Sequence, residues 1–353
     1  MVALFQKVKV HHEQQLPFVV FCKPNSDKII GLFQKDNSDY FIENFEEKGF
    51  VFAPFNDLNI PYIPIDACDV YVEKVAIFDF YIDNNINFVT NEKDQSDFEK
   101  LVQKGIDALQ SETFQKVVLS RKEIVAISNF DIELAFKKLI VNYPTAFNYC
   151  FFHPKTGLWL GATPEQFLKV NHHEIQTVAL AGTQIFDAVD EVIWGTKEKQ
   201  EQAFVSDFIV SSLKAYVDEV TVSEPYTSRA GNIVHIKTDI SAKLNVEKNL
   251  QSIIEALHPT PAVCGLPKGT AKDFILQNEG YEREYYSGFL GELNIDLATF
   301  KTEQFDLFVN LRCMKIVENA AELFIGCGIT KDSNPNKEYV ETLNKSLTMK
   351  KVL

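Results

Sequence analysis

A lysine and a glutamate, 49 positions apart, supply the two halves of an acid–base pair. Lys116 opens the apolar run 116–121, and Glu165 ends the Gly/Pro-containing segment 161–165. Such a pair can work as general base and general acid near neutral pH if burial lowers the pKa of the lysine and raises that of the glutamate. Taken alone, the two residues also fit a strand-end lysine whose amine reaches solvent and an exposed turn glutamate.

Two segments that are predicted to be helical each carry two glutamates three positions apart. Glu198 and Glu201 form one pair, and Glu338 and Glu341 form the other. At this spacing both carboxylates lie on one helix face. If the two helices face each other, four carboxylates converge and require a cation, and hard oxygen ligands without His or Cys favour Mg²⁺. The alternative is two solvated helix faces, with Lys345 forming an ordinary surface pair with Glu341.

Three further features could bind a small anionic ligand. Gly326 and Gly328 follow an apolar strand, where their backbone N–H groups could approach an anion or form a tight turn. Arg312 stands in a segment, 305–317, that reads as one apolar strand, and its guanidinium requires a carboxylate from the protein or from a ligand. His235, in another predicted strand, fits a packed core histidine as well as a catalytic one.

The composition restricts the class of partner and the compartment. The formal charge is −14 with no Lys/Arg-rich block, which argues against a nucleic-acid or anionic-membrane surface. Six scattered cysteines without a CxxC pair indicate free thiols in a reducing compartment. The first 17 residues lack the apolar core of a signal peptide, and no apolar run approaches the ~20 residues needed to span a bilayer. We therefore expect a soluble cytoplasmic protein.

The elements that must position these residues are mostly strands. The apolar pattern predicts strands at 18–22, 29–33, 40–42, 51–53, 70–80, 117–127, 147–152, 158–160, 167–170, 175–181, 233–241, 285–295, 305–317 and 321–329. It predicts helices from Ser96, where Ser96 and Glu99 form a capping box, at 131–143, 197–218, 246–257 and 271–277, and from Asn336, with a loop at 258–270. Runs of strands broken by few helices predict an α+β fold with large antiparallel sheets, and no linker divides the chain.

Nine motifs, in this order, resemble those of the chorismate-utilising enzymes: isochorismate synthases, salicylate synthases, and the large subunits of anthranilate and aminodeoxychorismate synthases. They are Lys116–Arg121, Gly161–Glu165, Leu180–Thr183, Lys197-x3-Glu201, His258–Ala262, Arg283-x2-Tyr286-x-Gly288, Arg312, Gly326-x-Gly328 and Glu338-x2-Glu341-x3-Lys345. The resemblance covers residues 96–350, with residues 1–95 as variable strands. It implies one chorismate-binding domain over 1–353, with the family fold of sandwiched antiparallel sheets and flanking helices.

The resemblance also implies the roles of the reacting and metal-binding groups. Lys116 would activate the water that attacks C2 of chorismate, Glu165 would protonate the departing C4 hydroxyl, and His235 would lie near C4. Glu201 and Glu341 would bind Mg²⁺ directly, with Glu198 and Glu338 in its water shell. The remaining residues that it implies bind substrate, through the ring carboxylate, the enolpyruvyl carboxylate or the pocket wall: Leu180, Gly182, Thr183, Ala262, Tyr286, Arg312, Gly326, Gly328 and Lys345.

Three positions indicate the branch of the family. The resemblance implies that Lys116 with Ala181 favours water over ammonia as nucleophile, and that Ala262 favours stopping at isochorismate. The expectation is an Mg²⁺-dependent, reversible isomerase, an isochorismate synthase without a glutaminase partner, feeding menaquinone or catechol siderophore biosynthesis. The nearest alternative is a salicylate synthase, which goes on to eliminate pyruvate. Further alternatives are an ammonia-using synthase and a chorismate-binding protein without activity. Gln202 and Cys264 depart from the family pattern at positions that often hold His and Gly or Ser.

Overall fold

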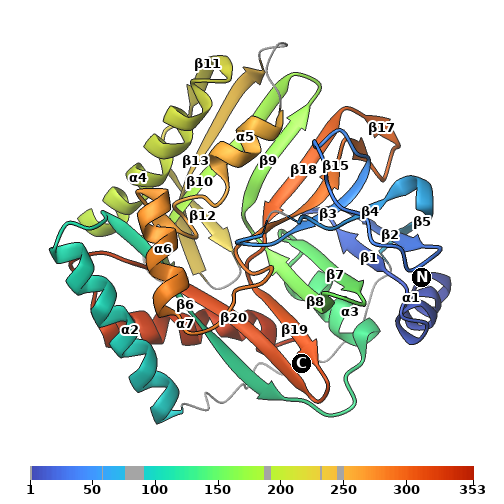
Figure 1. Cartoon of the computed structure of the whole chain (residues 1–353), viewed down its shortest axis with the longest axis horizontal. Coiled ribbons are helices and arrows are strands. Elements are labelled where there is room, and N and C mark those ends of the chain that lie inside the picture. The colour runs from blue at the N-terminus through green and yellow to red at the C-terminus, as the bar shows by residue number, and fades with distance from the viewer. Residues whose placement is uncertain (1, 58, 76–90, 187–191, 231–232, 245–249) are drawn as a thin grey trace.

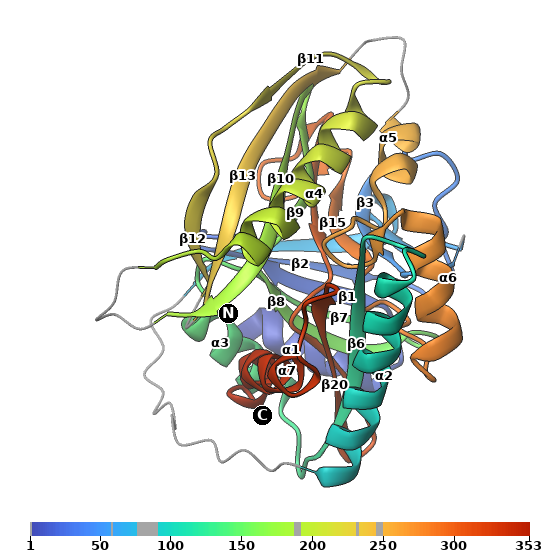
Figure 2. The ribbon, with the colours of Figure 1, turned by 90° about the vertical axis from the view of Figure 1, so that its left-hand side faces the viewer.

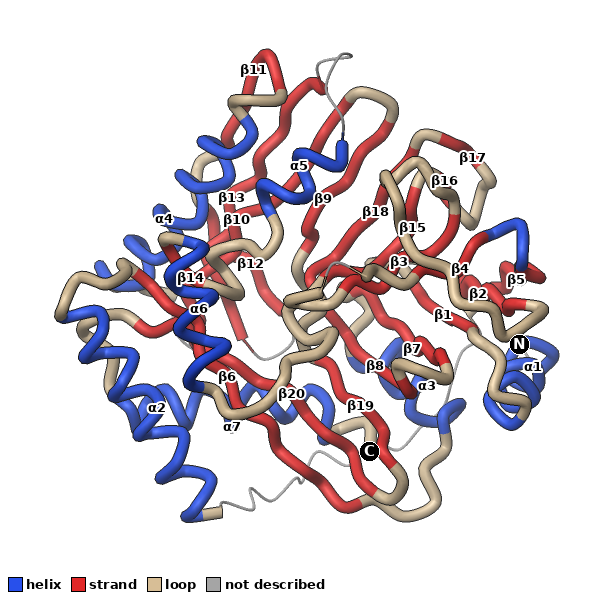
Figure 3. The backbone as a smooth tube through the Cα atoms, viewed as in Figure 1, coloured by secondary structure: helices blue, strands red, loops and turns tan. Residues whose placement is uncertain are grey.

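The computed structural model describes residues 2–57, 59–75, 91–186, 192–230, 233–244 and 250–353. Within them, two large antiparallel sheets form the centre of the molecule and helices lie around them (Figures 1 and 3). No helix in these ranges combines the length and the apolar character that crossing a membrane requires.

The first sheet contains, in spatial order, β14 (Gly265–Leu266), β6 (Lys116–Ala126), β20 (Ala320–Ile329), β19 (Cys313–Val317), β8 (Gly157–Thr163), β7 (Phe147–His153), β1 (Phe18–Cys22), β2 (Lys28–Gln34) and β5 (Cys68–Lys74). The second contains β11 (Val217–Val222), β13 (Ile233–Leu244), β10 (Glu174–Ile185), β9 (Gln166–Asn171), β18 (Gln304–Val309), β15 (Phe289–Leu293), β3 (Gly49–Ala53) and β4 (Tyr62–Pro64), with β12 (Tyr226–Ala230) also paired to β13. A short ribbon joins β16 (Ile295–Asp296) to β17 (Lys301–Thr302).

The described helices are α1 (Val2–Glu13), α2 (Glu92–Gln110), α3 (Ile132–Asn142), α4 (Thr196–Leu213), α5 (Leu250–Leu257), α6 (Lys268–Asn278) and α7 (Pro335–Lys350), with a 3₁₀ turn at Ile65–Ala67. The apolar clusters place α1, α3 and the end of α7 on the first sheet, and α4 and α5 on the second. α2, α6 and the start of α7 pack together around β6 and β20 (Figure 2). The helices thus cover the sheets from outside and leave the space between the sheets for the core.

Aromatic side chains fill the space where the two sheets face each other. Phe52 of β3 stacks on Phe151 of β7 with ring centroids 4.3 Å apart, and Phe147 stacks on Phe308 of β18 at 4.4 Å. All four rings are buried. Stacked aromatic pairs contribute about 0.5–1.5 kcal/mol each beyond the burial of their area. The many phenylalanines of the sequence therefore join sheet to sheet, and strands from before residue 96 take part in both sheets.

The α+β class with large antiparallel sheets is confirmed, but several predicted element bounds are wrong. The predicted strand 40–42 is a single bridge between Phe41 and Pro61. The helix predicted from Ser96 begins at Glu92, because the side chain of Asn91 accepts a hydrogen bond from the Lys93 amide and caps it. The first helix, α1, was not predicted.

The middle of the chain departs from the prediction in two further places. The helix predicted over 197–218 ends at Leu213, and the next residues form β11. The predicted loop 258–270 contains β14 and the first turn of α6. The predicted elements at 70–80 and 246–257 correspond to β5 and α5, and their parts at 76–80 and 246–249 lie outside the described residues.

The predicted strand 305–317 is two strands that belong to different sheets. β18 ends at Val309 in the second sheet, and β19 begins at Cys313 in the first. Arg312, between them, adopts a φ of +48° that strands do not use. Apolar periodicity is the same on both sides of this break, so the sequence pattern gives no signal of it.

Candidate active site

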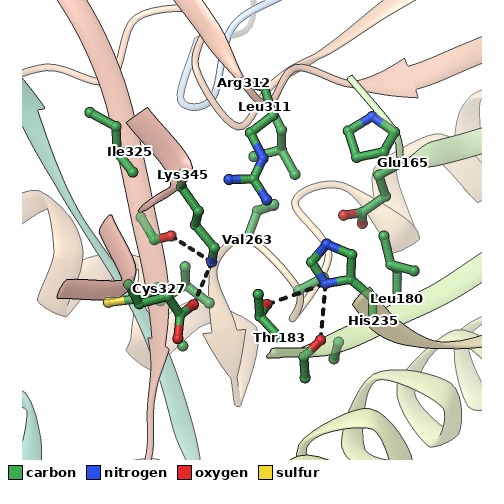
Figure 4. A pocket seen from close by; sticks show the side chains of 18 of the residues that line it. Glu165, Leu180, Thr183, His235, Val263, Leu311, Arg312, Ile325, Cys327 and Lys345 are labelled. Atoms are coloured by element: carbon green, nitrogen blue, oxygen red, sulfur yellow. Dashed lines mark hydrogen bonds and ion pairs between the residues drawn. The ribbon is translucent and has the colours of Figure 1, made fainter. Parts of the chain in front are cut away.

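A cavity of about 100 Å³ lies between the ends of the two sheets and is bounded by α4 and α7 (Figure 4). It brings together most of the residues that the sequence singled out. Its lining consists of Val118, Pro164, Glu165, Leu180, Ala181, Gly182, Thr183, Glu198, Glu201, His235, Ala262, Val263, Tyr286, Leu311, Arg312, Phe324, Ile325, Gly326, Cys327, Gly328, Glu341 and Lys345. Of the candidate site residues, only Lys116 and Glu338 do not line it.

Lys116 lies directly behind the cavity wall. It is the first residue of β6 and is only 1% exposed. Its Nζ lies 2.9 Å from Oε1 of Glu201, which does line the cavity. The carboxylate of Glu201 therefore separates the amine from the cavity in this arrangement, and any ligand or cation that engages Glu201 changes the surroundings of the amine.

Glu165 lies in the connection between β8 and β9 and reaches the cavity from the side of the second sheet. Its backbone oxygen accepts a hydrogen bond from the amide of Val309, and Thr163 donates its hydroxyl to the Val309 oxygen, so β18 holds this turn in place. The side chain is 4% exposed, and burial raises its pKa to about 8, although the positive charges of Lys116 and Arg312 act in the opposite direction. Glu165 is therefore a carboxylic acid that carries its proton at neutral pH.

His235 of β13 is neutral and presents an unprotonated nitrogen. Burial lowers its pKa to about 3. Its Nδ1 lies 2.9 Å from the backbone oxygen of Gly182 and 3.2 Å from Oγ1 of Thr183. A carbonyl oxygen can only accept, so we assign the ring proton to Nδ1, which leaves Nε2 as an acceptor. Nε2 is buried without a hydrogen-bond partner among the described residues, and Figure 4 shows this side of the ring facing Glu165 and Arg312. It is suited to accept a hydrogen bond from a ligand or from Glu165.

Gly182 forms a bulge that lets α4 approach the sheet. The register of β10 against β13 shifts between Ala181 and Thr183, and Gly182 has a φ of +71°. A Cβ at this position would lie 3.1 Å from Cβ of Glu198, at the start of α4. Glycine is required here both for the backbone conformation and for the close approach of the helix.

Arg312 is held at the crossover between the sheets and not within a strand, contrary to the sequence prediction. Burial lowers its pKa, while Tyr286 and Glu341 act to raise it. None of the described residues forms an ion pair or side-chain hydrogen bond with its guanidinium. Figure 4 shows the guanidinium pointing into the cavity between Lys345 and His235. A partly buried cation without a side-chain partner among the described residues favours an anion, so the geometry favours a carboxylate-bearing ligand.

Gly326 and Gly328 lie near the C-terminal end of β20, which ends at Ile329, so the predicted strand 321–329 with glycines at its exit is confirmed. Gly326 lies opposite Ser120 of β6, and Gly328 lies opposite Val118. The amides of Ser120 and Val118 do not donate to β20: the first donates to Oε1 of Glu279 and the second to the backbone oxygen of Cys264. These are therefore non-hydrogen-bonded pairs, and the peptide groups of both glycines point away from β6. Lys345 donates to the Gly326 oxygen at 3.0 Å on that side, and β19 ends its pairing at Phe324. Backbone N–H groups thus remain available beside the cavity.

The two glycines also make room for side chains. A Cβ at Gly326 would lie 2.6 Å from the hydroxyl of Tyr286, and a Cβ at Gly328 would lie 2.3 Å from Oε1 of Glu201. Both distances are too short for any non-bonded contact. The strand therefore needs glycine at alternate positions so that Tyr286 and Glu201 can reach the cavity.

Three of the four predicted metal-binding glutamates line the cavity. Glu198 and Glu201 come from α4 and Glu341 from α7, whereas Glu338 of α7, 4% exposed, does not line the cavity. Glu341 pairs with Lys345 at 2.6 Å, as Glu201 pairs with Lys116. Among the described residues no three His, Cys, Asp or Glu side chains converge closely enough to hold a metal ion. These carboxylates fit an Mg²⁺ that binds two of them and completes its coordination shell with water and ligand oxygens. The four predicted glutamates do not form a closed metal site.

Sequence reasoning missed a buried ion pair beneath the cavity. Arg283 pairs with Glu279 and donates to the backbone oxygens of Val118 and Val263, both at 2.8 Å. Glu279 also accepts from the amide and hydroxyl of Ser120. Of these two residues, only Arg283 belongs to a motif named from the sequence, and its pairing with Glu279 was not predicted. The pair ties β6 to the loop before β14, and so holds two walls of the cavity together.

The chain matches a family model of chorismate binding enzymes over residues 80–353. It is 29% identical over 270 residues to the salicylate biosynthesis isochorismate synthase of Pseudomonas aeruginosa, covering 74% of this chain and 55% of that protein. It is 28% identical over 266 residues to the isochorismate synthase EntC of Escherichia coli K12, covering 72% of this chain and 66% of that protein. The chain thus spans between half and two thirds of the length of these relatives.

A comparison with solved structures agrees on the fold. A candidate 2,3-dihydroxybenzoate-specific isochorismate synthase, DhbC, from Bacillus anthracis superposes with a TM-score of 0.79 at 22% identity, covering 99% of both chains. At this identity the likeness concerns the fold. It extends over the variable strands before residue 96, which the sequence motifs did not reach.

Proposed function

This chain belongs to the family of chorismate binding enzymes, and from that premise we propose that it is an isochorismate synthase that converts chorismate reversibly to isochorismate. The observation that carries the proposal is a buried Glu165 whose pKa of about 8 keeps it protonated at neutral pH, in one cavity with the guanidinium of Arg312, which has no side-chain partner in the described part of the chain. The first is the acid that a departing hydroxyl needs, and the second is the cation that a dianionic substrate needs.

In the proposed reaction, water adds at C2 of chorismate as the C4 hydroxyl leaves. Lys116 takes the proton from the attacking water, and Glu165 gives its proton to the C4 oxygen, which departs as water. The neutral His235 accepts a hydrogen bond beside Glu165 and keeps the acid in place. One proton is taken up and one is delivered, so the reverse reaction uses the same two groups with their roles exchanged.

Substrate carboxylates would be bound by cationic and polar groups that line the cavity. Arg312, the hydroxyl of Tyr286 and the N–H groups of Gly326 and Gly328 would bind the enolpyruvyl carboxylate. Lys345 and Thr183 would help to hold the ring carboxylate, and Leu180 with Ala262 would form the apolar wall beside the ring. Charge-assisted hydrogen bonds of this kind are the strong ones in a buried site.

We assign Mg²⁺ binding to Glu201 and Glu341, with Glu198 in reach of its water shell. When bound, the cation would supply positive charge for the ring carboxylate of chorismate. Glu201, which pairs with the proposed base Lys116, is also a carboxylate that we assign to the metal. A bound cation would compete with Lys116 for this carboxylate and so weaken the ion pair. Glu338 does not line the cavity, and we assign it no contact with the metal.

The nucleophile we propose is water, so the enzyme needs no glutaminase partner. Cytoplasmic location and a role in menaquinone or catechol siderophore biosynthesis remain the expectations from the sequence. All six cysteines are free and buried, in agreement with a reducing compartment.

A product assay tests the function. Purified protein is incubated with chorismate, with and without Mg²⁺, in water enriched in ¹⁸O, and the products are separated and weighed by mass spectrometry. The proposal requires Mg²⁺-dependent isochorismate carrying one ¹⁸O. Salicylate with pyruvate would identify the salicylate synthase alternative, an aminated product formed with ammonium would identify an ammonia-using synthase, and no product would leave a chorismate-binding protein.

A further inference from the structure

One buried hydrogen bond between helix and sheet lies next to the carboxylates of the cavity. Nε2 of Gln202, in α4, donates to Oγ1 of Thr238, in β13, at 2.6 Å. Gln202 is 4% exposed and Thr238 is 1% exposed. Burying an amide and a hydroxyl costs free energy unless they bond each other with good geometry, so this pair restricts how α4 can lie on the sheet.

The rest of this helix–sheet contact is apolar. Val205, Ile209 and Leu213 of α4 pack in one cluster with Ile240 of β13 and Ile253 of α5. Apolar contact is non-directional, and it tolerates small slides and rotations when the volumes are kept. The helix begins at Thr196, and its N-cap residue, Gly195, supplies no side-chain cap. Apolar burial therefore holds α4 on the sheet, but it does not determine the rotation of the helix about its own axis.

The rotation of α4 matters because its first two turns carry the cavity carboxylates. Glu201 precedes Gln202 directly, and Glu198 lies one helical turn before it. A rotation of ~20° moves a carboxylate that lies ~6 Å from the helix axis by about 2 Å. Metal sites tolerate errors of only about 0.5 Å. A directional bond at Gln202 is therefore placed where it controls the position of both carboxylates.

Two close contacts agree with a helix held at one rotation. The first turn of α4 sits against the bulge at Gly182, where a Cβ would lie 3.1 Å from Cβ of Glu198, and Oε1 of Glu201 lies where a Cβ on Gly328 would be 2.3 Å away. These close approaches leave little room between the start of the helix and the two sheets. The hydrogen bond at Gln202 is one turn further along the same face, and it completes the anchoring of this end.

We propose that Gln202 and Thr238 are positioning residues, which set the rotation of α4 so that Glu198 and Glu201 face the cation site. The inference rests on the proposed function only in taking Mg²⁺ as the cation. Neither residue touches the substrate or the metal. Their effect acts through Glu201, and it is therefore expected in the affinity for the cation more than in the overall stability of the fold.

The test compares binding of Mn²⁺, a hard divalent probe for the Mg²⁺ site, to the full-length chain without substrate. The bound fraction is measured from the electron paramagnetic resonance signal of free Mn²⁺, and competition by Mg²⁺ identifies the site. The variants are Gln202→Leu, Thr238→Val and the two combined, with Thr238→Ser as the conservative variant that keeps the hydroxyl. Thr177→Val is the matched control, because Thr177 of β10 donates a buried 2.7 Å bond to the Phe167 oxygen and contacts no cavity carboxylate.

The expected result is a loss of Mn²⁺ affinity of about tenfold in Thr238→Val and Gln202→Leu, as is usual when a group that orients a metal ligand is removed. The combined variant should lose no more Mn²⁺ affinity than the single variant with the larger loss, because both substitutions remove the same hydrogen bond. Thr238→Ser and Thr177→Val should bind as the parent chain does, whatever their urea midpoints. Parent-like affinity in Thr238→Val, or an equal loss in Thr177→Val, would overturn the inference.

The same samples separate this inference from the proposed function. If the parent chain forms isochorismate and binds the cation, but the two Gln202–Thr238 variants bind equally well, only the positioning role fails. If the variants lose affinity while no isochorismate forms, the positioning role stands and the proposed function fails. A parent chain that binds neither Mn²⁺ nor Mg²⁺ overturns the positioning role, and it overturns the proposed function as well if no isochorismate forms.

Discussion

The raised pKa of Glu165 predicts that this carboxyl destabilises the folded chain as the pH rises. Burial raises its pKa from an ordinary 4.5 to about 8. Between these two values the folded chain holds a proton that the unfolded chain has released, so the free energy of unfolding falls with increasing pH. The stabilisation is complete below pH 4.5 and is lost as the pH passes through 8.

The size of the effect follows from the shift. At 1.36 kcal/mol per pKa unit, the loss between pH 4.5 and the region above pH 8 amounts to about 5 kcal/mol. Glu165→Gln isolates this contribution, because glutamine has the shape of the protonated acid and cannot ionise. The parent and the variant should be similar in stability near pH 5. Above pH 8 the variant should be the more stable by about that amount, while being inactive.

Urea unfolding at intervals from pH 5 to pH 9 measures the difference, with the fluorescence of the fully buried Trp159 as probe. All other titrating groups are common to the two chains and cancel. In the parent chain, kcat/KM for chorismate should also fall above pH 8, as the acid loses its proton. A difference in unfolding free energy that stays constant within about 1 kcal/mol across this range would refute the burial argument.

Three further substitutions test other parts of the site. Lys116→Ala should lower isochorismate formation by about 10³-fold with an unchanged circular dichroism spectrum, since it removes the base; turnover within tenfold of the parent chain would exclude that role. Arg312→Met should lower kcat/KM by about 30-fold, mainly through KM, as expected for the loss of one charge-assisted contact worth about 2 kcal/mol; an unchanged KM in initial-rate assays would contradict carboxylate binding. Gly328→Ala should raise the Mg²⁺ concentration for half-maximal activity, because its Cβ would lie 2.3 Å from Oε1 of Glu201, whereas Gly269→Ala, with nothing within 4 Å, is the control that should leave it unchanged.

Local patterns were sufficient for the class of fold and for most elements. β1 is a continuous apolar run and β7 is nearly so, with Asn148 and His153 as its polar residues; such runs are typical of strands that are buried on both faces, as these two are. The helix predicted over 131–143 is α3, and the side chain of Asp131 caps it by accepting a hydrogen bond from the Leu134 amide. These features depend on residues that are close in sequence, so the sequence displays them.

The failures share one cause. The break at Arg312 divides a continuous apolar run because the two halves pair with different sheets, and the choice of partner is made by residues far away in the chain. Gly326 and Gly328 stand at the end of β20 as predicted, but the sequence does not display that they also make room for Tyr286 and Glu201. A local window contains neither the partner strand nor the side chain that needs the space.

The sequence by itself determined which groups are present: a lysine and a glutamate suited to acid–base chemistry, two pairs of glutamates, and an arginine among apolar residues. Tertiary structure alone decided what these groups can do. It buried Glu165 so that its pKa rises, set Lys116 behind Glu201, gave Arg312 no side-chain partner among the described residues, and placed Glu338 outside the lining of the cavity. The physical reason is that desolvation and charge pairing depend on neighbours in space, and the pairing of the two sheets supplies those neighbours from distant parts of the chain.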